Sequence, residues 1–320
     1  YPPNVVNVPA ATTTDATAKT GQSVANQSKP DASGSGGIDN YLETVEGGIA
    51  VYTRSGTQQL TSTYQTWFNM PSSQFVDPVT VWDDTGDRFI FSVLQQGTST
   101  IQVSVAQQTD ATGTYCNYSF SNLANQDFDH LGVDADGIYV SANVLSSTGQ
   151  VVNNELFYAS RTAMESCQSV TATDWTNLTN RDLTIARAIT PAKEDGSTPG
   201  VEYLVNSFPA GACEVTLWSL TSAGVLSAFT VPTQCYNPPP KSKQKGSSAT
   251  ISTGDCSVTQ ASVVNGLLTF ATPGAYNWND GHGAVSIVEW YEINPSTRTL
   301  STEGAFGTPG YSLFYPAAVT

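Results

Sequence analysis

Residues 77–94 read DPVTVWDDTGDRFIFSVL: a β-rich run, a short Asp- and Gly-containing break, and a second β-rich run. Asp and Gly supply the backbone conformations that tight hairpin turns require. This stretch therefore predicts a β-hairpin. The same order of strand, tight turn and strand recurs at 129–145, 186–208 and 256–273.

Each of these hairpins is followed by a second one, at 101–120, 155–172, 214–231 and 284–306. Four strands per unit, with units starting roughly 50 to 70 residues apart, are typical of β-propeller blades. A double-sheet sandwich or a prism also uses many short strands, but it has no reason to repeat the same two hairpins. We expect an all-β fold, a β-propeller of five four-stranded blades with an extended N-terminal arm.

The fifth blade is expected to combine both ends of the chain. Residues 47–69 have the form of a second hairpin, and the terminal YSLFYPAAVT (311–320), with Phe314 and Tyr315, resembles the opening strand of a first hairpin. Together they would supply three strands of a blade. The missing strand would leave an open sheet edge beside the terminal strand.

The N-terminal segment differs from the rest of the chain in composition. Residues 1 to about 40 hold mainly Pro, Ala, Thr, Ser and Gly, so they cannot bury enough apolar surface to order themselves. We therefore divide the chain into an arm, residues 1–44, and a β-propeller, residues 45–320.

One part of the arm is suited to pairing with a sheet. It contains β-branched residues between prolines, a pattern that favours a short inserted strand formed by Asn4, Val5, Val6 and Val8. We expect the terminal strand to lie between this arm segment on one side and the hairpin strand near residues 47–52 on the other.

Several stretches resemble a known family. DPVTVWDDTGDRFIF (77–91), LGVDADGIYVSANV (131–144) and EGAFGTPGYSLFYPAAV (303–319) are similar to a family of secreted, largely uncharacterised microbial β-propeller proteins. The resemblance covers most of residues 45–320. It implies the fold and a secreted setting, but no catalytic residues. This chain departs from the family by stopping soon after its Phe-Tyr-Pro strand.

The charge balance restricts the possible partners. The net charge is −15 with 12 Lys and Arg residues in all, so nucleic acid is not expected as a partner. No apolar run approaches the roughly 18 residues of a membrane span. A polar, Thr-rich chain with no apolar leader before Tyr1 is typical of a processed, extracellular, secreted protein.

The five cysteines lack the CxxC spacing of zinc or redox sites. Cys213 and Cys235 lie equally far from Gly224, so a hairpin turning there would place them opposite each other within disulfide reach. Two other pairings remain open, Cys116 with Cys167 and Cys256 with Cys235. One thiol is left over in any case.

Three sequons predict glycosylation in surface loops, at Asn26, Asn117 and Asn177. A chain rich in Asn, Ser and Thr also produces such triplets by chance.

The sequence gives only weak indications of a metal site or a catalytic site. The loop at 82–89 could hold Ca²⁺, although its Asp and Gly residues also suit a turn. Asp77, Asp129 and Asp182 lie at comparable strand starts, where carboxylates of a glycosidase could gather, but such residues more often cap turns. We assign no catalytic residue, no metal and no cofactor.

The leading functional hypothesis is a secreted structural subunit that assembles into filaments, its arm adding a strand to the incomplete blade of a neighbouring copy. A lysine-rich loop would attract the acidic body of that copy through Lys241, Lys243 and Lys245. The alternative is a monomeric secreted propeller that binds or cleaves polysaccharide at its axial face. The expected partners are thus other copies of the chain, with glycans as a second class.

Overall fold

The computed structural model describes residues 5–7, 21, 31–281 and 283–317. The chain forms two compact units, the first comprising residues 17–178 and the second residues 1–16 and 179–320. Each unit is described by itself.

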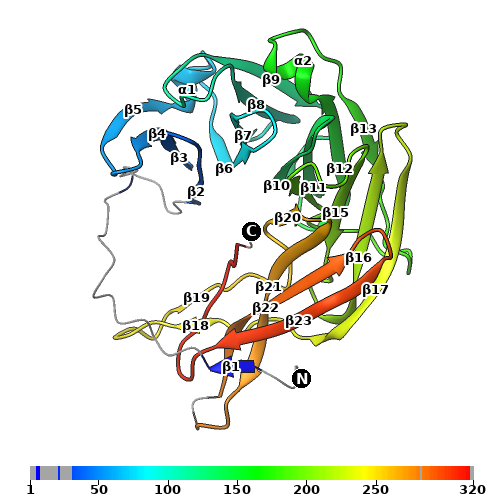
Figure 1. Cartoon of the computed structure of the whole chain (residues 1–320). Helices are drawn as coiled ribbons and strands as arrows, with labels where there is room; N and C mark the ends of the chain where they lie inside the picture. Colours follow the sequence, from blue (N-terminus) through cyan, green and yellow to red (C-terminus); the bar gives the residue numbers. More distant parts are fainter. Residues whose placement is uncertain (1–4, 8–20, 22–30, 282, 318–320) are drawn as a thin grey trace. The chain divides into compact units, whose positions relative to one another are not determined.

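The first unit contains three four-stranded antiparallel sheets in which each strand pairs with the next along the chain (Figure 1). Their strands are β2 (Ser33–Gly36), β3 (Asn40–Val45), β4 (Gly48–Thr53) and β5 (Gln58–Thr63); β6 (Phe75–Asp83), β7 (Arg88–Gln95), β8 (Thr100–Ala106) and β9 (Tyr115–Ser121); and β10 (Gln126–Val133), β11 (Gly137–Leu145), β12 (Val151–Ser160) and β13 (Thr173–Thr176). Two short helices follow β5 and β12, α1 (Tyr64–Trp67) and α2 (Arg161–Glu165).

The second unit adds two more sheets of four consecutive antiparallel strands. They are β14 (Thr190–Glu194), β15 (Val201–Asn206), β16 (Ala212–Thr221) and β17 (Leu226–Tyr236), then β20 (Ala261–Val264), β21 (Leu267–Asn277), β22 (Ala284–Asn294) and β23 (Thr299–Gly307). The first strands of the two sheets, β14 and β20, pair in parallel. A small hairpin lies between the sheets in sequence, β18 (Ser242–Lys243) with β19 (Thr250–Ile251).

Consecutive four-stranded meanders are the blades of a β-propeller, so the all-β propeller fold and its five four-stranded sheets are confirmed. The four pairs of hairpins expected from the sequence are β6–β9, β10–β13, β14–β17 and β20–β23. None of the helices in the described part of the chain has the length and apolar character needed to cross a membrane.

The expected composition of the remaining blade is wrong. All four of its strands come from residues 33–63, and the described residues of the C-terminal segment, 311–317, form no strand. Instead, the Leu313 N–H donates to the Ser286 carbonyl, and Tyr315 is exposed with a φ of 51°. Phe314 and Tyr315 therefore mark no open strand edge.

The two strands that the sequence analysis missed lie in the predicted arm. Strand β2 reads SGSG, which lacks the β-branched and aromatic residues that indicate a strand. Small residues are needed here: a Cβ at Gly34 would lie 2.1 Å from the Tyr41 hydroxyl, and one at nearby Gly37 would lie 2.5 Å from the Phe89 ring. Because β2 and β3 belong to the first sheet, the boundary expected at residue 45 falls too late.

The arm does contribute a strand, but at a different edge. Strand β1 (Val5–Asn7) pairs in parallel with β23 of the same chain, Val5 opposite Ala305 and Val6 opposite Phe306. The expected placement of this segment beside the C-terminal strand is therefore wrong. Val5 packs on Val285 and Ile287, while Asn4 and Val8 lie outside the described residues.

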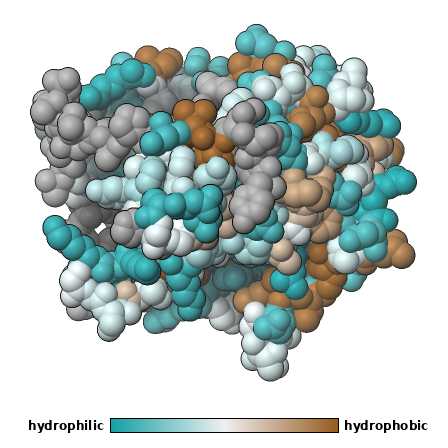
Figure 2. All heavy atoms as spheres, turned by 90° about the horizontal axis from the view of Figure 1, so that it is seen from below, coloured by the Kyte–Doolittle hydropathy of each residue, from teal (hydrophilic) through white to brown (hydrophobic). Residues whose placement is uncertain are grey.

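The core explains why β7 reads as a continuous apolar run. Phe89, Phe91 and Val93 face one cluster with β3 and β4, while Ile90 and Leu94 face another with β10 and β11. A strand buried on both faces loses the polar alternation of a surface strand. In Figure 2, by contrast, the surface shows hydrophilic residues interspersed with smaller apolar groups, as expected of ordinary protein exteriors.

The disulfides follow the sequence analysis. Cys213 on β16 is joined to Cys235 on β17, and Cys116 is joined to Cys167, while Cys256 is a buried free thiol. The pairing of Cys256 with Cys235 is therefore wrong. Burial raises the pKa of Cys256 to about 12, so its reactive thiolate form is suppressed in the folded protein.

We expect Phe91→Ala to lower the free energy of unfolding by about 3 to 5 kcal/mol, because Phe91 is fully buried and its removal leaves a cavity. Urea unfolding followed by circular dichroism measures this change. Val152→Ala, at a residue that is 50% exposed, is the control and should change stability by less than about 0.5 kcal/mol. A loss below about 1 kcal/mol for Phe91→Ala would contradict the two-sided packing of β7.

Alkylation should distinguish Cys256 from the other cysteines. In denaturant without reductant, only Cys256 should be labelled, because the other four are in disulfides. In the native protein it should stay unlabelled because it is buried. Mass spectrometry of the digest reads out both states, and a label at Cys213 or Cys235 without reductant would refute their pairing.

Candidate carboxylate site

The first strand of each sheet in the first unit begins with the same backbone irregularity. Asp31, Asp77 and Phe128, at or near the starts of β2, β6 and β10, have φ values of 36°, 51° and 54°. In β6 and β10 the strand register shifts at this point. Bulges of this kind re-aim side chains, and positive φ at non-glycine residues costs about 1 kcal/mol or more. In the second unit, Ala188 before β14 repeats the irregularity with a φ of 49°.

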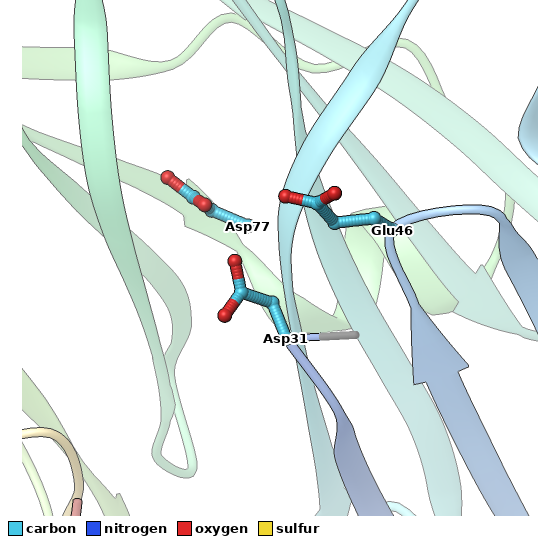
Figure 3. A group of neighbouring side chains, drawn as sticks. All are labelled: Asp31, Glu46 and Asp77. Atoms are coloured by element: carbon cyan, nitrogen blue, oxygen red, sulfur yellow. The ribbon is translucent and has the colours of Figure 1, made fainter. Parts of the chain in front are cut away.

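Three carboxylate side chains lie close together near these strand starts of the first unit. The side chains of Asp31, Glu46 and Asp77 point toward one another, and the facing oxygens all lie within 4.8 Å of each other (Figure 3). Asp31 precedes β2, Glu46 lies in the turn between β3 and β4, and Asp77 belongs to β6. Asp31 is exposed and the other two are half-buried. We call these three residues the carboxylate cluster.

The backbone of β10 holds Asp77 in position. The Phe128 N–H donates to Asp77 Oδ2 at 3.1 Å. This donor exists because the positive φ of Phe128 interrupts the ladder between β10 and β11, which leaves its N–H to point at β6. A backbone N–H donor stabilises a carboxylate and fixes its orientation.

A fourth carboxyl group, Asp129, is 3% exposed and lies close enough to Asp77 for the charge of Asp77 to act on it. Its Oδ2 accepts a hydrogen bond from the Ser92 hydroxyl at 2.6 Å, and its Oδ1 has no hydrogen-bond partner among the described residues. Burial raises the pKa of Asp129 well above its usual range, and the charges of Asp77 and Asp127 add to this effect, whereas the Ser92 hydrogen bond lowers the pKa. The protonated form of Asp129 is thus favoured.

The carboxylate cluster has the donor chemistry of a hard-cation site. Three carboxylates offer up to six oxygens, and Ca²⁺ takes 6 to 8 oxygens at about 2.3 to 2.6 Å. Two oxygens on opposite sides of such an ion would lie about 5 Å apart. The facing oxygens of the cluster lie within 4.8 Å of one another, close enough to contact one such ion together.

The other acidic motifs serve structural roles. In the loop at 82–89, Asp83 is buried, its Oδ2 accepts from Arg161 Nη1 at 2.8 Å, and its Oδ1 accepts from the Thr85 N–H. Asp134 accepts from the N–H groups of Asp136 and Gly137 in its own turn. These contacts support the turn interpretation over the calcium interpretation.

Of the three strand-start aspartates, the structure brings two together. Asp77 lies close enough to Asp129 for its charge to act on that carboxyl. Asp182 belongs to the second unit and is bonded locally, accepting from the N–H and the hydroxyl of Thr184. The sequence analysis missed Asp31 and Glu46, because one lies in an arm-like segment and the other reads as an ordinary turn residue.

The remaining predicted residues lie at separate places. Asn117 is in the middle of β9 rather than in a loop, exposed, with its Oδ1 accepting from the Ser104 hydroxyl. Asn177 is exposed just after β13, and Asn26 lies outside the described residues. The three lysines of the hairpin region are exposed, namely Lys241, Lys243 and Lys245. Glycosylation and assembly at these residues stay predictions.

No family model and no curated protein matches this chain. Among solved structures it is similar to an exo-β-1,3-galactanase from Phanerochaete chrysosporium, with 13% identity, a TM-score of 0.41, and coverage of 85% of this chain and 62% of the other. It is also similar to the GH43 endo-arabinanase from Bacillus licheniformis, with 13% identity, a TM-score of 0.38 and coverage of 85% and 96%. A third is an exo-β-1,3-galactanase from Clostridium thermocellum, with 11% identity, a TM-score of 0.43 and coverage of 86% and 60%.

These similarities are too low to transfer a site or an activity. The chain spans about three fifths of the length of the two galactanase chains. The strand pairing and the carboxylate cluster together define the class: an all-β propeller with a candidate acidic site at the strand starts of its first unit.

Replacing Asp31 by Asn tests whether repulsion among the three carboxylates of the carboxylate cluster destabilises the folded protein. In a chelator at low salt, removing one of three close negative charges should raise the melting temperature by about 1 to 3 °C. Differential scanning calorimetry measures the change. Asp39→Asn, another exposed aspartate of the same region but outside the cluster, is the control and should have no effect. A lower melting temperature for Asp31→Asn would contradict the repulsion.

Proposed function

We propose that the protein acts on polysaccharide as a glycoside hydrolase, with the carboxylate cluster as its active site. The observation that carries this proposal is the spacing of Glu46 and Asp77, whose facing oxygens lie within 4.8 Å. Retaining glycosidases hold their two carboxyl groups about 5 to 5.5 Å apart, whereas inverting enzymes leave about 6.5 to 9.5 Å for a water molecule. For this close pair we propose the retaining reaction.

The surroundings of the two side chains suggest separate roles. Asp77 is held by the Phe128 N–H, which stabilises the negative charge and orients the group, so Asp77 is assigned as the nucleophile. Glu46 lies in a turn and is half-buried, so a leaving-group oxygen can approach it. We assign it as the acid and base.

The proposed reaction has two steps. Asp77 attacks the anomeric carbon while the glycosidic oxygen leaves with the proton of Glu46, which forms a covalent glycosyl ester. Glu46 then removes a proton from a water molecule, which attacks the same carbon and releases Asp77. The exposed carboxylate of Asp31 would accept hydrogen bonds from sugar hydroxyls.

Asp129 is a positioning residue in this scheme. It lies too deep for substrate contact, being 3% exposed. Because burial favours its protonated form, it can lie near Asp77 without adding a full negative charge. The carboxylate of Asp77 then meets less repulsion from this neighbour.

The setting proposed for this activity is extracellular. Two disulfides in the described chain are typical of proteins made in an oxidising compartment. Filament assembly through the arm has less support, because β1 pairs with β23 of its own chain.

Cleavage can be measured as new reducing ends released from a panel of neutral polysaccharides: glucan, galactan, xylan and arabinan. The unaltered protein should cleave at least one of them. Asp77→Asn removes the nucleophile and Glu46→Gln removes the acid and base, so each should lower the rate by about 10² to 10⁴-fold. Product analysis by NMR should show retention at the anomeric carbon.

Asp39→Asn is again the matched control, because it removes an exposed carboxylate outside the cluster. Its rate should equal that of the unaltered protein. Cleavage that survives both cluster substitutions would exclude this active site. Binding without cleavage across the panel would reduce the protein to a glycan-binding module.

A further inference from the structure

A second buried carboxyl group lies in the other unit, on β22, and the proposed hydrolase activity does not involve it. Glu289 is 4% exposed. Its Oε2 accepts a hydrogen bond from the Tyr291 hydroxyl at 2.9 Å, and its Oε1 has no hydrogen-bond partner among the described residues. The carboxyl lies against β21, because a Cβ at Gly274 would come within 2.3 Å of Glu289 Oε1.

Apolar clusters flank Glu289 along its own strand. On one side Val285 and Ile287 pack with Ala305 and Val5. On the other side Tyr291 and Ile293 belong to a larger cluster. Residues two apart on a strand share a face, so Glu289 lies between these clusters on one face of the sheet.

A contact between neighbouring sheets covers this carboxyl. A cavity of about 10 Å³, close to the minimum that holds one water molecule, is lined by Gln234, Glu289, Tyr291, Glu303 and Gly304. The Gln234 N–H on β17 donates to both carboxylate oxygens of Glu303 on β23, at 3.1 and 3.0 Å. This bond links β17 to β23 beside Glu289.

The groups around Glu289 disfavour its ionised form. Burial and the negative charge of Glu303 raise the pKa of Glu289 to about 7, while the hydrogen bond from Tyr291 lowers it. Among the described residues, the other titratable groups that act on it or feel its charge are Tyr291, Tyr236 on β17 and Cys256. Burial raises the pKa of each of these three groups, so they stay neutral while Glu289 titrates.

We propose that Glu289 is a pH switch that controls the contact between β17 and β23 and, through it, the attachment of the N-terminal strand β1. An ionised Glu289 would face the Glu303 carboxylate across a space for one water molecule. Repulsion would move Glu303 away from the Gln234 N–H, and water would enter to solvate the new charge.

Strand β1 is the element most exposed to this change. Val5 is opposite Ala305 on β23, and Ala305 is opposite Glu289 on β22, so the three residues form one row across the sheet. Strand β1 pairs over three residues at a sheet edge, which is a weak attachment. A shift of β23 would therefore release it first.

The direction follows from the raised pKa of Glu289. A group protonated more readily in the folded state contributes stability that is fully present below its unfolded pKa, near 4.5, and is lost as pH rises through about 7. The contact should be closed at pH 5.5 and open at pH 8.

Hydrogen exchange with mass spectrometry on the full chain tests the switch at these two pH values, after correction for the intrinsic pH dependence of exchange. Between pH 5.5 and 8, protection of β23, Gln234 and residues 5–7 should fall by about tenfold or more. Glu289→Gln should keep the same protection at both pH values. Glu292→Gln, on the opposite face of the same strand, is the matched control and should behave like the unaltered chain.

Glu303→Gln provides a second variant that does not alter Glu289 itself. Removing the negative charge of Glu303 removes the repulsion, so the change in β23 protection between the two pH values should become smaller, and what remains of it should move to lower pH. Equal protection of the unaltered chain at both pH values would overturn the proposal. A pH dependence of protection that persists in Glu289→Gln would also overturn it. If Glu289→Gln does not fold, a transition in Glu303→Gln that is the same as in the unaltered chain would overturn it.

Discussion

Burial of strand β7 on both faces is the constraint on which the first unit depends. Its phenylalanines pack toward β3 and β4, and its Ile90 and Leu94 pack toward β10 and β11. A sheet that is apolar on both faces is stable in water only between two other sheets. This stacking also brings the first strands of the three sheets together at one end, where their irregular starts present acidic side chains.

The strands that could be predicted from the sequence are those whose residues carry the packing. The runs around Phe91 and Val140 combine β-branched and aromatic residues with Asp-Gly turns, so their hairpins were recognised. Strand β2 could not be recognised, because its SGSG sequence has no β-branched or aromatic residue, and Gly34 reflects the space left by Tyr41 rather than any preference for a strand. In turn, the C-terminal residues Phe314 and Tyr315 were assigned to a blade that needed no further strand.

The carboxylate site could be predicted only in part, for a similar reason. Asp77 and Asp129 were recognised because each follows the same strand-start pattern within a repeat. Glu46 reaches the site through the turn between β3 and β4, and no repeat marks it. Residues brought together by turns of different length leave no periodic signal in the sequence. Cys213 and Cys235 could be paired from the sequence, because the two strands of a hairpin are symmetric about its turn.

The same solvation effect acts on Asp129 and Glu289, although they lie in different units. Both are almost fully buried, and in both, burial is the largest cause of the raised pKa. Asp83 shows the other way to bury a carboxylate, since it bonds Arg161 at 2.8 Å. Among the described residues, neither Asp129 nor Glu289 has such a partner. Protonation neutralises a buried carboxyl that lacks a cation, and it favours the folded state as pH falls. The packing around both residues is therefore linked to the pH of their surroundings.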